Sequence, residues 1–101
     1  HGAEVLLATL TPVTSVREQT DPGTQAAITA LNSEIRGMSG LAGVSGVVDL
    51  HAMLDGIPGI IGSDGLHPTV AGYRRIAEIF FADIVSRYDV TPRAPTFTTA
   101  H

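Results

Sequence analysis

The pattern of apolar and polar positions predicts two buried strands with an amphipathic helix between them. Residues 3–10 are apolar except for Glu4 and Thr9, and Pro12 follows shortly after this run. Residues 44–50 form a second short run that is rich in valine. Such runs are typical of strands buried on both faces of a parallel sheet, and a short buried helix is the alternative for the first run.

The segment between the two predicted strands begins without any period, so we expect a loop over residues 11–23. Asp21 and Pro22 then predict a helix start, because an aspartate side chain caps free backbone N–H groups and proline fits the first turn. We expect the helix to span residues 23–39. Its predicted buried face has three- and four-residue spacing and consists of Ala27, Ile28, Leu31, Ile35 and Met38.

The clearest element is a last helix, from Pro68-Thr69 to about Tyr88. The residues before it, 51–68, are rich in glycine and proline and predict an irregular loop. Residues 90–101 are rich in proline and threonine and predict a linker or tail after a domain over residues 1–89. The predicted buried face of the last helix, with Phe80 rather than Phe81 turned inward, consists of Val70, Tyr73, Ile76, Ala77, Phe80, Ile84 and Val85.

The order strand, helix, strand, loop, helix predicts a right-handed βαβ unit and therefore an α/β fold. Two parallel strands alone leave both faces and both edges of the sheet largely uncovered, so we expect further strands beside them. The sequence therefore reads as the C-terminal part of a larger α/β domain, or as a chain that completes its sheet with a second copy.

Composition narrows the classes of function. The chain has 101 residues, of which 44% are hydrophobic, and a net charge of −4, which suits one globular domain. Its six basic residues are scattered, so we expect no nucleic-acid partner. The absence of cysteine excludes disulfides, thiolate metal sites and a cysteine nucleophile. No apolar run approaches 18 residues and no leader pattern is present, so we expect neither membrane insertion nor a signal peptide.

The candidate chemistry lies in the loop before the last helix, where Asp64 precedes His67 by three residues. At this spacing on a turn, the carboxylate can accept the imidazole Nδ1–H, fix the tautomer and leave Nε2 free to take a proton from a nucleophile. The same spacing also occurs in helix caps and in pairs of metal ligands, so spacing alone leaves these alternatives open.

The residues around this pair are more specific. Residues 64–77 read Asp-Gly-Leu-His-Pro-Thr-Val-Ala-Gly-Tyr-Arg-Arg-Ile-Ala. This segment resembles the last conserved block of the SGNH (GDSL-type) serine esterases and lipases, and the likeness extends more weakly over residues 3–88. The resemblance implies a flavodoxin-like three-layer α/β/α fold, of which this chain supplies the last two parallel strands and two helices. It also implies that His67 is the general base and that Asp64 orients it.

The sequence departs from the family by lacking the upstream blocks. In the family these carry the nucleophilic serine in a Gly-Asp-Ser context, and the glycine and asparagine of the oxyanion hole. No serine of this chain has that context or a Gly-x-Ser-x-Gly elbow. We therefore expect the nucleophile on an N-terminal half and a small ester with a short acyl or acetyl group as the substrate. A carbohydrate is one candidate carrier of that group, and thioesters and lysophospholipids stay open. We expect no cofactor and no metal, although Asp49 and His51 beside the pair suggest a cluster as the lesser alternative.

Two other classes of function compete with an ester hydrolase. One is a non-catalytic binding or structural module that self-associates to complete its sheet. The other, a flavodoxin-like nucleotide or phosphate binder, ranks last because the chain lacks a glycine-rich turn between a strand and a helix. The sequence does not fix the compartment, but the Thr/Pro-rich tail resembles linkers of secreted multidomain esterases.

Overall fold

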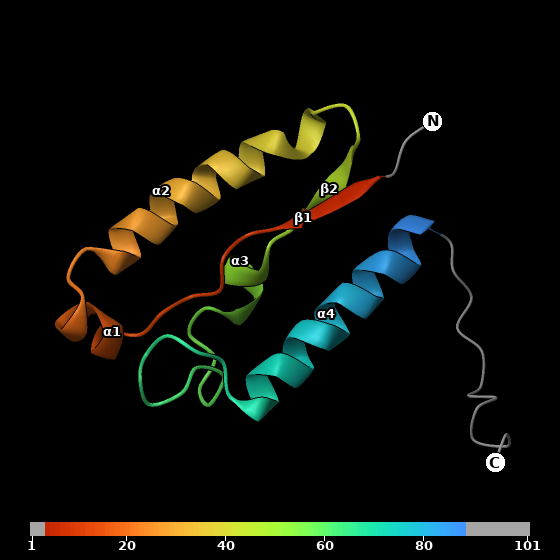
Figure 1. Cartoon of the computed structure of the whole chain (residues 1–101). Coiled ribbons are helices and arrows are strands. Elements are labelled where there is room, and N and C mark those ends of the chain that lie inside the picture. Colours follow the sequence, from red (N-terminus) through yellow and green to blue (C-terminus); the bar gives the residue numbers. More distant parts are fainter. Residues whose placement is uncertain (1–3, 89–101) are drawn as a thin grey trace, which may run out of the picture.

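A computed structural model of the chain describes residues 4–88, so the predicted tail at 90–101 lies outside the described part (Figure 1). Two parallel strands, β1 (Val5–Ala8) and β2 (Val44–Val48), form its sheet. They are shorter than the predicted runs but lie within them. The prediction of an α/β fold with two parallel strands is confirmed.

Helices fill most of the remaining described chain. In chain order they are α1 (Ser15–Thr20), α2 (Thr24–Arg36), the 3-10 helix η1 (Gly37–Gly40), α3 (Leu50–Leu54) and α4 (Val70–Tyr88). The helix between the strands and the last helix were both predicted. The expectation of only two helices is wrong, because the described chain has two further short α-helices.

Helix α1 lies in the segment predicted as a loop. It forms through local side-chain bonds rather than an apolar face: the Thr14 hydroxyl accepts from Val16 N at its start. Glu18 then accepts from the backbone N–H of Gly23 and Gln25 at 2.6 and 3.0 Å. As a result α2 starts after Gly23 rather than at the predicted aspartate cap.

Helix α3 corrects the second loop prediction, because residues 50–54 are helical and only the rest of 51–68 is irregular. Asp49 caps this helix, since its Oδ1 accepts from Ala52 N at 3.2 Å. The strand predicted to reach Leu50 therefore ends at Val48, and the chain turns directly into a helix.

The core lies between the sheet, α3 and the inner face of α4. Gly72 allows α4 to approach the preceding loop, because a Cβ at this position would collide with the carbonyl oxygen of Ile60. Half-buried residues Leu6, Ala8, Ile61, Ile76 and Phe80 pack around the core. The core residues themselves are Val48, Leu50, Leu54, Ile60 and Ile79.

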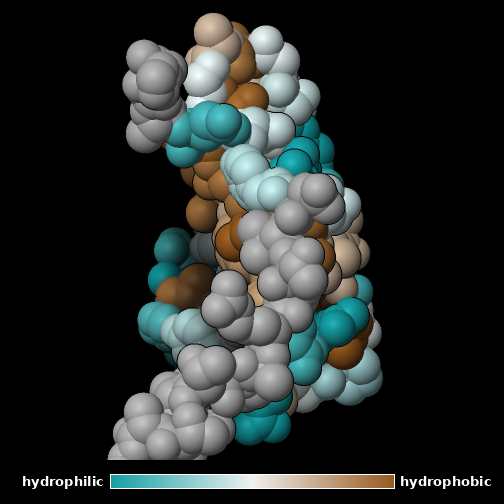
Figure 2. Space-filling view, turned by 90° about the vertical axis from the view of Figure 1, so that its right-hand side faces the viewer, coloured by the Kyte–Doolittle hydropathy of each residue, from teal (hydrophilic) through white to brown (hydrophobic). Residues whose placement is uncertain are grey.

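Several residues predicted to be buried are exposed. Tyr73 on α4 is 57% exposed and Leu31 on α2 is 45% exposed, so the predicted buried faces of both helices are wrong in part. The choice between the adjacent phenylalanines is confirmed, since Phe80 packs against the core and Phe81 is exposed. Figure 2 shows the side on which α4 lies, where hydrophobic patches reach the surface between hydrophilic ones.

Candidate active site

The predicted pair lies on the loop that leads from α3 into α4. This loop is closed by backbone bonds at its base: Gly62 N donates to the carbonyl of His67 at 2.8 Å, and Thr69 N donates to the carbonyl of Ile60 at 2.8 Å. Between these two bonds Ile61 and Pro68 form an isolated antiparallel bridge. The loop is therefore a defined hairpin-like structure rather than an open connection.

Within this loop the structure brings Asp64 and His67 together. His67 Nδ1 lies 2.6 Å from Asp64 Oδ2. The other carboxylate oxygen, Oδ1, accepts from the backbone N–H groups of Leu66 and His67 at 2.9 and 3.0 Å. Asp64 thus orients the imidazole with one oxygen and holds the turn with the other, which favours the tautomer with a proton on Nδ1.

The electrostatics of the pair follow from these bonds. The hydrogen bond from the His67 side chain is the largest cause that lowers the pKa of Asp64 well below its usual range, and the two backbone N–H groups add to it. Asp64 therefore stays ionised across the whole range in which imidazoles titrate. Both side chains reach solvent, with 50% of Asp64 and 70% of His67 exposed. No hydrogen bond within residues 4–88 involves His67 Nε2, so this nitrogen can accept a proton.

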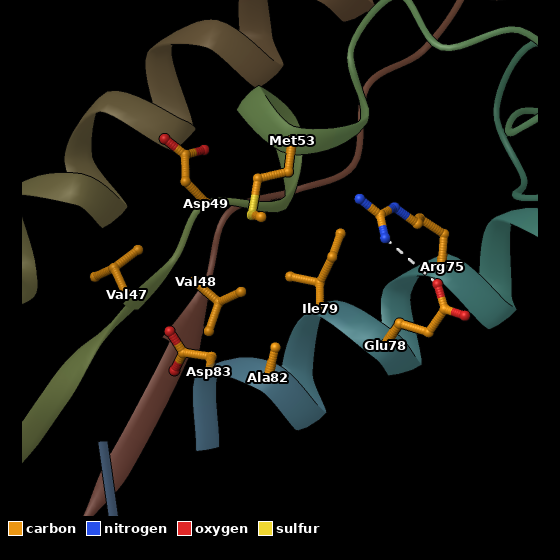
Figure 3. Close-up of a pocket in the computed structure, with 9 residues that line it drawn as sticks. All are labelled: Val47, Val48, Asp49, Met53, Arg75, Glu78, Ile79, Ala82 and Asp83. Atoms are coloured by element: carbon orange, nitrogen blue, oxygen red, sulfur yellow. Dashed lines mark hydrogen bonds and ion pairs between the residues drawn. The ribbon is translucent and has the colours of Figure 1, made fainter. Parts of the chain in front are cut away.

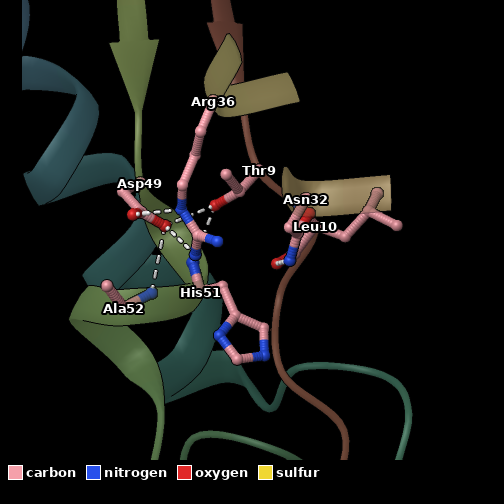
Figure 4. A network of polar contacts seen from close by, with 7 residues as sticks. All are labelled: Thr9, Leu10, Asn32, Arg36, Asp49, His51 and Ala52. Carbon is pink, nitrogen blue, oxygen red and sulfur yellow. Dashed lines mark hydrogen bonds and ion pairs between the residues drawn. The ribbon is translucent and has the colours of Figure 1, made fainter. Parts of the chain in front are cut away.

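A second polar network lies at the carboxyl ends of the strands (Figure 4). Two nitrogens of Arg36, on α2, donate hydrogen bonds to the Asp49 carboxylate at 2.8 and 3.0 Å. The hydroxyl of Thr9, at the end of β1, donates to Asp49 at 2.9 Å and accepts from His51 N at 3.0 Å. Bonds to Arg36 are the largest cause that lowers the pKa of Asp49 to about 2. This network ties α2, β1 and α3 together.

The network argues for a structural role of Asp49 and His51. Every recorded bond of Asp49 goes to a side chain or to the N-terminal turn of α3, and the His51 imidazole points away from Asp49 (Figure 4). Among residues 4–88, no three or more His, Asp or Glu side chains are placed to hold a metal ion together. The alternative of a four-residue cluster therefore gains no support.

One cavity lies away from the predicted pair. It is an open groove of about 450 Å³ between β2 and α4 that includes neither Asp64 nor His67 (Figure 3). Its rim carries the ion pair of Arg75 with Glu78 at 3.4 Å. The residues that line it are Val47, Val48, Asp49, Met53, Arg75, Glu78, Ile79, Ala82 and Asp83. A substrate of the predicted pair would have to bind elsewhere.

Sequence reasoning missed the residues that attach the loop to the rest of the molecule. Thr14 N donates to the carbonyl of Gly65 at 2.9 Å, and Gly65 is buried with φ +75°. A glycine one residue after a turn-forming aspartate was a readable signal for positive φ. Its contact with Thr14, which lies 51 positions earlier in the numbering, was not readable from a local pattern.

Comparisons with known proteins identify no relative. No family model matches the sequence, and neither a curated protein nor a solved structure matches it. No helix within residues 4–88 combines the length and the hydrophobicity that a membrane span requires. The function therefore has to be inferred from the residues and their geometry.

Proposed function

We propose that this chain is the C-terminal part of a serine ester hydrolase and that it supplies two members of a Ser–His–Asp triad. His67 is the general base, Asp64 orients it, and the nucleophile and oxyanion donors belong to an N-terminal half that this sequence does not contain. The observation that carries the proposal is the 2.6 Å contact between His67 Nδ1 and Asp64 Oδ2, on a turn whose backbone fixes the carboxylate. The motif of residues 64–77 adds the resemblance to SGNH enzymes.

The geometry suits proton transfer in ester cleavage. Neutral His67 donates a hydrogen bond from its Nδ1–H group to Asp64. The lone pair on Nε2 is therefore free to take the proton of an attacking serine hydroxyl. Ionised Asp64 stabilises the imidazolium that forms. His67 then returns the proton to the alkoxide leaving group, which leaves an acyl-serine. In the same way His67 activates a water molecule, and attack of this water on the acyl-serine releases the carboxylic acid. We propose short acyl or acetyl esters, carried on a carbohydrate, as substrates.

One edge of β1 has no partner strand among residues 4–88, which supports the expectation of a further half. Val5 N donates to the carbonyl of Gly43 and Thr9 N to that of Val48, so alternate residues of β1 face β2. Leu6 and Ala8 therefore direct their backbone N–H and C=O groups to the other edge. Backbone groups in this arrangement bind water or pair with another strand.

The side chain of Asn32 defines where this edge ends. Its Oδ1 accepts from Leu10 N at 2.7 Å, and its Nδ2 donates to the carbonyl of Leu10 at 3.3 Å. Both backbone groups of Leu10 are thus paired by a side chain from α2. A strand that adds to β1 can pair alongside Leu6 and Ala8, and it has to leave the sheet before Leu10.

An apolar stripe on α4 is a second surface that has no partner among residues 4–88. Glu78 and Ala82 line the groove between β2 and α4, whereas Tyr73 and Ile84 lie on the opposite flank of the helix. The stripe has the spacing of one helix face, and all its members are exposed: Val70, Tyr73, Ala77, Phe81, Ile84 and Tyr88. Such a stripe is typical of a surface that another part of a protein covers.

The proposal is tested with a fluorophosphonate probe, which labels activated serines, followed by intact-mass analysis under denaturing conditions. We expect the complete hydrolase to be labelled on its N-terminal half, and His67→Ala to lower labelling and ester hydrolysis by about 1,000-fold or more. His51→Ala is the matched control, and it should keep activity within about threefold. Wild-type hydrolysis by His67→Ala, or a label on a serine of this chain, would contradict the proposal.

A second candidate is a non-catalytic module that pairs with a copy of itself. The open edge of β1 favours it, because the backbone groups of Leu6 and Ala8 can pair with the same edge of a second copy. The mass of the isolated chain in solution, measured by light scattering, separates the two. A stable dimer that no probe labels favours the module, and labelling of a co-purifying chain favours the hydrolase.

A further inference from the structure

The side chains of Asp64 and His67 are exposed, so burial does not fix their position and the bonds of their loop have to do so. Two bonds inside the loop fix the imidazole relative to the carboxylate: Gly65 N donates to the carbonyl of Gly62 at 3.0 Å, and His67 N donates to Asp64 Oδ1 at 3.0 Å. None of these bonds reaches β1 or β2. The place of His67 relative to the sheet therefore depends on how the whole loop is attached.

The tip of the loop is attached at the start of α1. Gly65 is buried there, and its carbonyl accepts from Thr14 N at 2.9 Å. A Cβ at Gly65 would stand 2.5 Å from Arg17 N and 2.7 Å from the Thr14 hydroxyl. Because one of these atoms belongs to the backbone, a side chain at Gly65 is accommodated only if the loop moves away from α1.

Thr14 is itself fixed relative to the sheet. The two residues before it, Pro12 and Val13, are buried, and three residues, 9–11, join them to the end of β1. The chain therefore runs from the carboxyl end of β1 through a buried segment to Thr14, and from Thr14 across one hydrogen bond to Gly65. In parallel sheets the reacting groups gather at the carboxyl ends of the strands.

We propose that Thr14 and Gly65 are positioning residues of the hydrolase, whose contact sets the distance from His67 Nε2 to the carboxyl ends of the strands. This inference rests on the proposed function, because it concerns the reach of His67 to a nucleophile on the other half. The loop keeps the Asp64–His67 pair intact on its own, and the contact with α1 places that pair. A displacement of about 1 Å in such a geometry lowers the rate about 100-fold.

The test compares Gly65→Ala with Gly59→Ala in the complete hydrolase. Gly59 has φ +79° and nothing within 4 Å of a Cβ, so its alanine variant carries the backbone strain without the collision. We expect Gly65→Ala to lower kcat about 100-fold with KM changed less than twofold. We expect Gly59→Ala to keep kcat within about threefold. Equal kcat values for the two variants would overturn the proposal.

Nuclear magnetic resonance of the chain itself separates positioning from loss of structure. In Gly65→Ala the Thr14 amide should lose its protection from hydrogen exchange, while His67 keeps its Nδ1–H tautomer and the Ile79 amide in α4 stays protected. A tautomer change in Gly65→Ala would show that the contact holds the pair itself together, which overturns the proposal. If wild-type hydrolase has no esterase activity, the proposed function fails; if only the Gly65→Ala effect is absent, this inference alone fails.

Discussion

Replacing Asp49 by asparagine should destabilise the fold at neutral pH and have little effect near pH 2. Arg36 donates two hydrogen bonds to the Asp49 carboxylate, at 2.8 and 3.0 Å, and Thr9 and Ala52 donate to Oδ1. An asparagine keeps one oxygen for the cap of α3, but it loses the charge and presents an amide nitrogen to Arg36 or to the cap. The variant therefore removes mainly the ionic part of the network.

The magnitude follows from the lowered pKa of Asp49, which falls from 3.8 to about 2. At about 1.4 kcal/mol per pH unit, this shift sets a ceiling of about 2.5 kcal/mol. The side chains of Asp49 and Arg36 are 34% and 42% exposed, so solvent screening reduces the expected loss to about 1–1.5 kcal/mol. The folded pKa lies below the unfolded one. The stabilisation is therefore complete above about pH 4 and is lost as the pH falls through about 2.

The assay is urea unfolding of the parent chain and Asp49→Asn at pH 7 and pH 2, followed by circular dichroism. The difference in unfolding free energy should shrink from about 1–1.5 kcal/mol at pH 7 to about 0.3 kcal/mol at pH 2. Asp55→Asn is the matched control at the other end of α3, and it should change stability by less than about 0.5 kcal/mol at both pH values. An equal loss for Asp49→Asn at pH 7 and pH 2 would refute the electrostatic explanation.

Two further variants probe the strand edge and the triad. Asn32→Ala should cost about 2–3 kcal/mol, because Asn32 is 1% exposed and pairs both backbone groups of Leu10. Exposed Ser33→Ala should cost less than about 0.5 kcal/mol in the same urea assay, and equal losses would show that the pairing contributes nothing. Asp64→Asn should increase the share of the Nε2–H tautomer of His67, measured from imidazole ¹⁵N shifts. An unchanged tautomer would contradict the orienting role of Asp64.

The strands and α4 were predictable because their signals are carried by many residues at once. Continuous apolar runs indicated strands of a parallel sheet, and the parallel pair β1–β2 confirms the strands. The expected burial on both faces is wrong for β1, since Val5 is 47% exposed and the other three residues are only half-buried. The pattern of α4 is long enough to average out local exceptions, and its observed bounds, Val70–Tyr88, match the prediction. The turn that joins Asp64 to His67 was predictable for a different reason, since both partners lie within three residues.

The short helices were not predictable from period, because α1 buries no residue and α3 buries only Leu50 and Leu54. Helix α1 is held by the Thr14 cap and by the two backbone bonds that Glu18 accepts. Six residues are too few for a periodic signal to be separated from chance. The contact of Thr14 with Gly65 is harder still, because it joins two loops that only the complete fold brings together.

The observed buried side of α4 differs from the predicted one, and the difference shows how this helix packs. Spacing predicted Tyr73 and Ile84 to be buried, yet both are exposed, while Ile79, on another side of the same helix, is buried. A helix with apolar residues on two sides is typical of an element packed between two layers or beside two neighbours. The described chain provides contacts for only one of those sides. The edge of β1 at Leu6 and Ala8 also has no partner strand within residues 4–88. One added unit, with a strand along β1 and apolar residues against α4, would therefore satisfy both features together.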